Sequence, residues 1–169
     1  KEVNMQFLLG DTAPDLLFIA FGMNESGNSL DDQKANTKKI IDYARTLNPD
    51  CSVVLVSAFF PNIYNPNQQA WISNNLGVHE EAFYQLAEEY ENVAVAPVYS
   101  VYESIRTVKE GADYTSNLYN HPNDFGVRIY ADTIMAVLSE TKDTYCEANG
   151  HSWDDNSYCA KCETTCAHG

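Results

Sequence analysis

The stretch that decides the fold is residues 14–25, PDLLFIAFGMNE, in which six consecutive apolar residues lead to a glycine and then to polar residues. A short apolar run bounded by turn-forming residues is typical of a strand buried in a parallel sheet. Residues 11–14, DTAP, form the turn before it, and Gly22 ends it. We therefore predict a buried parallel strand over residues 14–22, with Asn24 in the polar loop directly beyond its carboxyl end.

Outward from this strand, helical and extended patterns alternate along the chain. We predict helices over residues 29–47, 79–90 and 123–140 and strands over residues 51–60 and 93–98, with an irregular region around Gly111. The last helix is expected to bury its apolar positions, Ile129, Ile134, Val137 and Leu138. Strands that alternate with helices form a parallel sheet covered on both faces. The expected fold is a flavodoxin-like three-layer α/β/α sandwich, in which ligands bind beyond the carboxyl ends of the strands.

The number of predicted strands is small for this architecture. An open parallel sheet usually has about five strands, and this chain supplies three. A sheet without its central strand exposes apolar surface. We therefore expect the N-terminal strands of the sheet to lie upstream of this sequence.

Composition limits the classes of partner. The 169 residues have a hydrophobic content of 44%, which supports a real core, and a net charge of −14. A strongly acidic surface repels phosphate backbones and anionic lipid, so we expect no nucleic acid partner. No apolar segment has the length of a membrane span, so we expect no membrane span either. A neutral or cationic substrate is compatible with this charge.

Two segments resemble conserved blocks of the SGNH (GDSL-like) hydrolase family. Residues 14–25 are similar to the strand ending in Gly-x-Asn-Asp of the family's third block. Residues 120–131, NHPNDFGVRIYA, are similar to the fifth block, in which a His-Pro pair begins a helix that carries Gly and Tyr-Ala. Alone, either motif is more often a turn or a surface loop. Together, in this order and about a hundred residues apart, they carry a resemblance over residues 14–140.

The resemblance implies an ester hydrolase and assigns roles to three residues. Asn24 becomes the oxyanion-hole donor with Gly22 in support, and His121 becomes the catalytic base. Ester hydrolysis needs hydrogen-bond donors fixed in advance for the developing oxyanion, and a histidine suits proton transfer at neutral pH. Pro122 favours an extended residue before it and a helix after it, and Asn123 is expected to cap that helix.

The sequence departs from the family pattern at the nucleophile. The family's serine lies in a Gly-Asp-Ser segment upstream of the third block, and nothing here fits. Gly10-Asp11-Thr12 precedes the strand and lies at its wrong end, and the family offers no precedent for Ser26 as a nucleophile. We therefore expect the serine and a second oxyanion glycine to lie upstream, and this fragment alone to be inactive.

The second departure is the acid that orients the base. The family has Asp three residues before the histidine, and this chain has Leu118. A backbone carbonyl acting instead gives a Ser-His dyad. Asp113 and Asp124 are the alternative carboxylates.

The tail differs from the rest of the chain. We divide the sequence into a partial hydrolase domain, residues 1–142, and a Cys/His-rich tail, residues 143–169. The tail suits a structural zinc ion held by Cys146, His151, Cys159 and Cys162. The alternative is a pair of disulfides among its four cysteines. Cys51 is expected to be a small buried side chain, and no cofactor is expected for catalysis.

Two functions from different classes follow. The first is a serine esterase acting on carboxylic esters, with acetyl groups on carbohydrate as the class that the resemblance to secreted bacterial members implies. The aromatic residues Phe59, Phe60, Tyr64 and Trp71 suit either stacking on sugar rings or packing. The tail is similar to short Cys/His repeats at the ends of bacterial cell-surface proteins, which favours an extracellular or cell-surface location. The rival is a non-catalytic binding or cell-surface module with a degenerate hydrolase fold.

Overall fold

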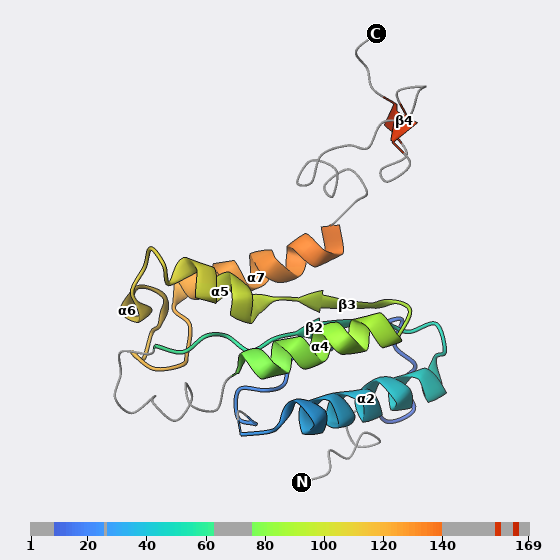
Figure 1. The fold of residues 1–169 in the computed structure, drawn as a ribbon. Coiled ribbons are helices and arrows are strands. Elements are labelled where there is room, and N and C mark those ends of the chain that lie inside the picture. The colour runs from blue at the N-terminus through green and yellow to red at the C-terminus, as the bar shows by residue number, and fades with distance from the viewer. Residues whose placement is uncertain (1–8, 26, 63–75, 140–157, 160–163, 166–169) are drawn as a thin grey trace. The chain divides into compact units, whose positions relative to one another are not determined.

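The computed structural model describes residues 9–25, 27–62, 76–139, 158–159 and 164–165. The chain forms two compact units, Lys1–Ile134 and Met135–Gly169. In the first unit, helices and strands alternate as the sequence predicts (Figure 1). The strands are β1 Leu16–Ile19, β2 Ser52–Val56 and β3 Val93–Ala96, and the helices are α2 Leu30–Leu47, α4 Gly77–Glu89, α5 Val98–Ile105, α6 Gly111–Tyr114 and α7 Asp124–Ser139, whose last turn belongs to the second unit.

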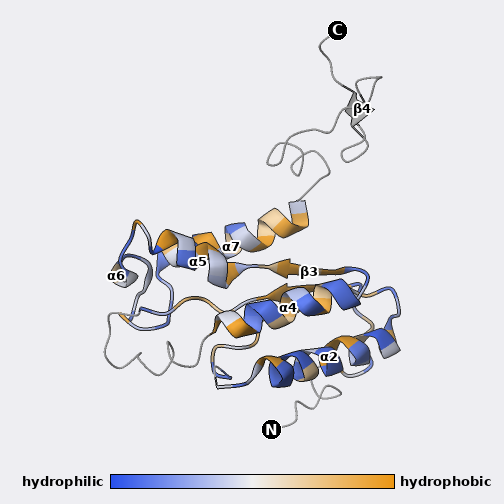
Figure 2. Ribbon diagram, viewed as in Figure 1, coloured by the Kyte–Doolittle hydropathy of each residue, from blue (hydrophilic) through white to orange (hydrophobic). Residues whose placement is uncertain are grey.

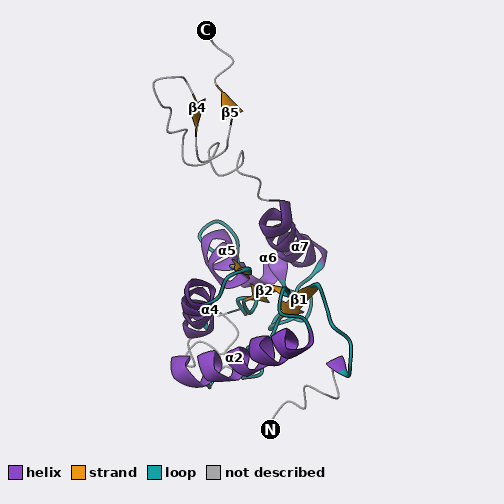
Figure 3. Cartoon of the chain, turned by 90° about the vertical axis from the view of Figure 1, so that its right-hand side faces the viewer, coloured by secondary structure: helices purple, strands orange, loops and turns teal. Residues whose placement is uncertain are grey.

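The three strands form a parallel sheet in the order β1-β2-β3. Helices α2 and α4 lie on one side of this sheet, and α5 and the first turns of α7 lie on the other (Figure 3). The α/β layering predicted from the sequence is therefore confirmed. The core between the sheet and the α2–α4 pair is built from aliphatic residues and one aromatic ring, among them Ile19, Ile41, Val53, Leu55, Phe83 and Leu86.

The helix boundaries follow local sequence signals. The Ser29 hydroxyl accepts a hydrogen bond from the Asp32 backbone N–H at 3.1 Å and caps α2, because the first turn of a helix has unpaired donors. Its buried positions Thr37, Ile40, Ile41 and Ala44 form one stripe, and the outward side is largely hydrophilic (Figure 2). Asn48 and Pro49 end the helix as predicted.

The prediction of a fully buried first strand is wrong. Leu16 and Phe18 are 42% and 43% exposed, and Ile19 is the one buried residue of β1. Strand β1 lies at an edge of the described sheet and pairs there with β2 alone, so its side chains have fewer neighbours than those of the central strand β2, which are buried from Val53 to Val56. Strand β1 is also shorter than predicted, because the chain leaves the sheet at Ala20.

The last helix also buries less than its periodicity predicts. Leu138 is 47% exposed, Ile129, Ile134 and Val137 are half-buried, and the buried residues of α7 are Gly126 and Thr133. Periodicity identifies an apolar face, but burial requires a neighbouring element to cover that face.

Two helices, α5 and α6, replace the irregular region predicted around Gly111. Pro97 has no backbone N–H, so β3 ends at Ala96 and α5 begins at Val98. The β-branched and aromatic residues of α5 favour helix weakly. The helix is stabilised instead by Val98 and Tyr102, which are fully buried. In the second unit, β4 Tyr158–Cys159 pairs antiparallel with β5 Thr164–Thr165.

Candidate active site

The loop after β1 carries Asn24 and begins with a conformation that glycine favours. Asn24 is exposed and lies five residues beyond Ile19, the last residue of the strand. Gly22 is buried and has a φ of 133°, which other residues rarely adopt. Its N–H donates to the Glu25 carboxylate at 3.3 Å, and the Asn28 N–H donates to the Glu25 carbonyl at 2.8 Å. Glu25 therefore closes the loop around Asn24.

A buried histidine, His79, packs against Gly22 at the start of this loop. Its side chain is inaccessible to solvent in the first turn of α4, and a Cβ atom at Gly22 would lie 2.8 Å from its Nδ1. Burial lowers the pKa of the imidazole, and the Asn28 backbone, Glu25 and the Gly22 backbone oppose this shift. Sequence reasoning treated His79 only as the start of a helix, and no local signal separates it from an ordinary helical residue.

The loop before α7 carries His121 and is organised by Asn117. The Asn117 side-chain oxygen accepts hydrogen bonds from the backbone N–H groups of three consecutive residues, Tyr119, Asn120 and His121, at 3.0, 3.1 and 3.0 Å. The His121 carbonyl accepts from the Ser116 N–H at 2.9 Å. The His121 side chain is exposed at the end of this turn. The sequence analysis missed Asn117, although asparagine is typical of such side chain–backbone turns.

Asn62 ties the His121 loop to the sheet. Its backbone N–H donates to the Tyr119 carbonyl at 2.7 Å, and its side-chain amide donates to the Leu118 carbonyl at 3.1 Å. Asn62 lies six residues beyond Val56, the last residue of β2. The loop is therefore fastened at the carboxyl end of β2.

The helix that follows His121 begins as predicted. The Asn123 side-chain oxygen accepts from the Gly126 N–H at 3.0 Å, and its amide donates to the Asp113 carbonyl at 2.8 Å. Pro122 lies opposite Thr115 in an isolated antiparallel bridge, which agrees with the extended backbone expected next to a proline. A Cβ at Gly126 would lie 2.6 Å from the Tyr114 carbonyl, so this glycine permits close packing of α7.

The topology brings the Asn24 loop and the His121 loop to the carboxyl end of the strands. Strands β1 and β2 are neighbours and run parallel, so the segments that follow them leave from the same edge, where α6 and the start of α2 also lie (Figure 1). Gly10, Asp11 and Thr12 precede β1 and lie at its opposite end, as the sequence analysis predicts. Ser26 lies outside the described residues.

The structure gives His121 no carboxylate partner among the described residues. Their two ion pairs join Glu89 to Lys34 and Lys38. One oxygen of the Asp113 carboxylate accepts from the Glu110 N–H in the capping box of α6, and the exposed Asp124 occupies the first turn of α7. Leu118, at the position of the family's aspartate, is exposed with a φ of 57°.

The predicted metal ligands lie mostly beyond the structural description. Cys146, His151 and Cys162 are outside the described residues, and Cys159 lies in β4. No group of three or more His, Cys, Asp or Glu side chains in the described part of the chain is placed to hold a metal ion. Cys51 is buried as expected, and burial raises the pKa of its thiol. Within the same residues, no helix is long and apolar enough to span a membrane.

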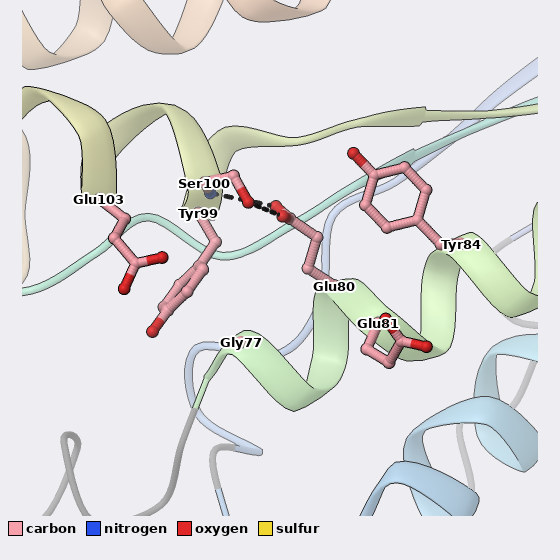
Figure 4. A pocket seen from close by; sticks show the side chains of 7 residues that line it. All are labelled: Gly77, Glu80, Glu81, Tyr84, Tyr99, Ser100 and Glu103. Carbon is pink, nitrogen blue, oxygen red and sulfur yellow. Dashed lines mark hydrogen bonds between the residues drawn. The ribbon is translucent and has the colours of Figure 1, made fainter.

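An acidic cleft of about 380 Å³ opens between α4 and α5 (Figure 4), and its lining includes neither Asn24 nor His121. Glu80 at its floor is buried, and its carboxylate accepts from the Ser57 hydroxyl at 2.6 Å and from the Ser100 N–H at 3.3 Å. Glu81, Glu103, Tyr84 and Tyr99 form its walls. Through these hydrogen bonds Glu80 of α4 links Ser57, the residue after β2, to Ser100 of α5.

Two of the four aromatic residues considered for sugar stacking, Phe59 and Phe60, pack in the interior. Phe59 and Phe60 are buried, and their rings lie 4.5 Å from Tyr102 and 5.2 Å from Tyr99. Tyr64 and Trp71 lie outside the described residues. Of the two readings that the sequence left open, packing holds for the two phenylalanines.

Comparison with known proteins points to one family. The model of the GDSL-like lipase/acylhydrolase family matches residues 2–129. The fold is similar to that of a Parabacteroides merdae protein described as a GDSL-like lipase, with 20% sequence identity and a TM-score of 0.61. It is also similar to a Streptococcus pneumoniae protein described as a platelet activating factor, with 21% identity and a TM-score of 0.59. The matches cover 74% and 73% of this chain but 60% and 59% of those proteins. No curated protein matches the sequence.

Proposed function

The chain belongs to the GDSL-like lipase/acylhydrolase family, and we propose that it contributes the base and one oxyanion donor to a serine esterase that hydrolyses carboxylic esters. In this proposal His121 takes the proton of the serine hydroxyl and then delivers it to the leaving alkoxide. The Asn24 amide donates a hydrogen bond to the oxyanion of the tetrahedral intermediate, and Gly22 sets the backbone that aims it.

One observation carries this proposal. The Asn24 loop follows β1, and the His121 loop is hydrogen-bonded to Asn62, which follows the adjacent parallel strand β2. Both loops therefore lie at the carboxyl ends of the strands, which is where such sheets bind ligands. Each loop has its own fixed support, Glu25 and Gly22 for one and Asn117 and Asn62 for the other. Preorganised donors and bases require this kind of support.

The proposed nucleophile is a serine in a Gly-Asp-Ser segment upstream of this sequence, together with the second oxyanion glycine. The edge position of β1 supports this, because among the described residues β1 pairs with β2 alone and can accept a further strand on its other side, and because Leu16, Phe18 and Phe21 are exposed on β1 or just beyond it. A backbone carbonyl is the proposed partner of the His121 ring, because Leu118 replaces the family's aspartate.

We propose acetyl groups on carbohydrate as the substrate class and the bacterial cell surface as the location. The support is the resemblance to secreted family members, the Cys/His-rich tail and a net charge of −14, which suits a neutral substrate better than an anionic one.

The experiment compares two proteins on p-nitrophenyl acetate. The protein extended upstream to include the Gly-Asp-Ser segment is expected to turn over the ester, and the 169-residue chain is expected not to. Robust turnover by the short chain that survives Ser26→Ala would contradict the assigned machinery. A gene whose start codon lies near Lys1 would favour the rival function, a non-catalytic module, which the lack of a carboxylate partner for His121 among the described residues also favours.

The proposed structural zinc ion is tested separately. Metal binding would supply most of the folding free energy of so short a segment. We expect about one zinc per chain in protein purified without chelator, and reactive thiols after EDTA. An absence of metal with thiols that react only after reduction would show disulfides instead.

A further inference from the structure

We propose that His79 is a positioning residue for the oxyanion loop, defined as residues 22–28, and that it fixes the side-chain amide of Asn24 by supporting the two ends of this loop. The inference rests on the proposed function. It concerns a residue that touches neither the ester nor His121, so it acts only through the loop.

The imidazole of His79 is buried without compensating hydrogen bonds in the described part of the chain. The His79 side chain has no solvent exposure, and neither Nδ1 nor Nε2 has a hydrogen-bond partner of normal geometry among the described residues. Buried polar atoms are nearly always paired, and each exception calls for an explanation. A leucine at this position would pack without leaving two nitrogen atoms unpaired, so the core alone does not account for a histidine.

The imidazole ring of His79 lies against the backbone of the oxyanion loop. Nδ1 lies so close to Gly22 that a methyl group there would approach it to 2.8 Å. The backbone groups that act on the ring belong to Gly22 and Asn28, which are the first and last residues of the oxyanion loop. The imidazole thus lies against both ends of the segment that presents Asn24.

The His79 ring is placed to form a hydrogen bond with the backbone of the oxyanion loop after a small movement. The imidazole lies next to these two backbone groups, and neither ring nitrogen forms a hydrogen bond of normal geometry with a described residue. Catalytic hydrogen bonds are often long in the free enzyme and tighten when the substrate binds. A small inward movement of the loop would let one ring N–H donate to a loop carbonyl. Such a bond would hold Asn24 against the developing oxyanion, where a displacement of about 1 Å costs up to about 10²-fold in rate.

The experiment uses the upstream-extended enzyme and the variants His79→Leu, His79→Gln and Phe83→Leu. Phe83 is an equally buried α4 residue that packs in the core, so it controls for lost packing. For p-nitrophenyl acetate we expect His79→Leu to lower kcat about tenfold with KM changed less than about twofold, because the loop acts in the transition state. In His79→Gln an amide N–H replaces the ring N–H as the hydrogen-bond donor, so this variant is expected to recover most of the rate.

A double-mutant cycle separates positioning from a general structural role. If His79 acts through Asn24, His79→Leu is expected to change kcat by less than about twofold in an Asn24→Ala background. A full tenfold loss in that background, or the same loss in Phe83→Leu, would overturn the proposal.

Hydrogen–deuterium exchange gives a readout that needs no activity. In His79→Leu and in His79→Gln, the backbone amides of residues 22–28 and 115–123 are compared with those of the unsubstituted protein. Exchange that is about tenfold faster in residues 22–28 alone, and restored by glutamine, supports the proposal. Unchanged exchange there would overturn it even in an active esterase. An inactive extended enzyme would remove the proposed function, and the exchange result would still decide whether His79 supports the loop.

Discussion

The two loops of the candidate active site are held in different ways. The His121 loop is fastened by side-chain amides, since Asn117 bonds three of its backbone N–H groups and Asn62 and Asn123 add further bonds. Among the described residues, the Asn24 loop has two side-chain hydrogen bonds, from the Gly22 N–H to Glu25 and from the Asn28 amide to Gln33, and it otherwise packs against the buried ring of His79. The His121 loop is therefore held mainly by hydrogen bonds of asparagine side chains, and the Asn24 loop depends more on packing against the helix α4.

The largest expected effect is that of replacing His121, the proposed base. In the extended enzyme, His121→Ala should lower kcat/KM for p-nitrophenyl acetate by about 10³-fold or more, because proton transfer loses its acceptor. The neighbouring Asn120→Ala is the control and should keep most of the activity. A His121→Ala enzyme that folds and retains more than about a tenth of the rate would exclude His121 as the base.

The second largest effect is expected from replacing Asn24, the proposed oxyanion donor. Asn24→Ala should lower kcat by about 10²-fold with little change in KM, since the donor acts mainly in the transition state. Steady-state kinetics on both variants compares the two loops directly. An effect on KM alone would make Asn24 a binding or turn residue.

A smaller effect is expected from the support of the His121 loop. Asn117→Ala removes the acceptor for three backbone N–H groups, and we expect a loss of about 1 kcal/mol of stability and about tenfold in kcat. Asn117→Asp keeps an acceptor oxygen and should restore both. Urea unfolding and ester turnover check this, and equal losses in the two variants would contradict an acceptor role.

The smallest effect is a pH dependence of the loop that relies on packing. The pKa of His79 is lowered in the folded protein by burial, and the facing Glu25 carboxylate only partly opposes this. The unfolded chain therefore binds more protons in the window from about pH 6.5 down to the lowered pKa. The free energy of unfolding should fall as the pH drops through this window and should be unaffected by His79 above it. Urea unfolding at pH 7.5 and 5.5 measures the change, and His79→Gln should reduce it. An identical pH dependence in that variant would assign the effect to other groups.

Much of the first unit could be predicted from the sequence, because its signals are local. The Ser29 cap, the Asn48-Pro49 stop and the Asn123 cap fix helix ends within a few residues. The helices α5 and α6 could not be predicted, since Val98 and Tyr102 stabilise α5 through tertiary burial. The same limit applies to the site. The motifs identify Asn24 and His121, but His79 and Asn62 lie far from them in the sequence and are connected to them only by the fold.

The edge strand β1 has a consequence for the behaviour of this chain in solution. Within the described part of the chain, the outer edge of β1 pairs with no other strand, so its backbone groups beside Leu16 and Phe18 are a template for intermolecular strand pairing. The net charge of −14 opposes such contacts by mutual repulsion between molecules. Because the Debye length shortens from about 30 Å at 0.01 M salt to about 8 Å at 0.15 M, salt weakens that repulsion. The chain should therefore stay dispersed in dilute buffer and turn turbid as electrolyte is added, in contrast to the salting-in of many globular proteins.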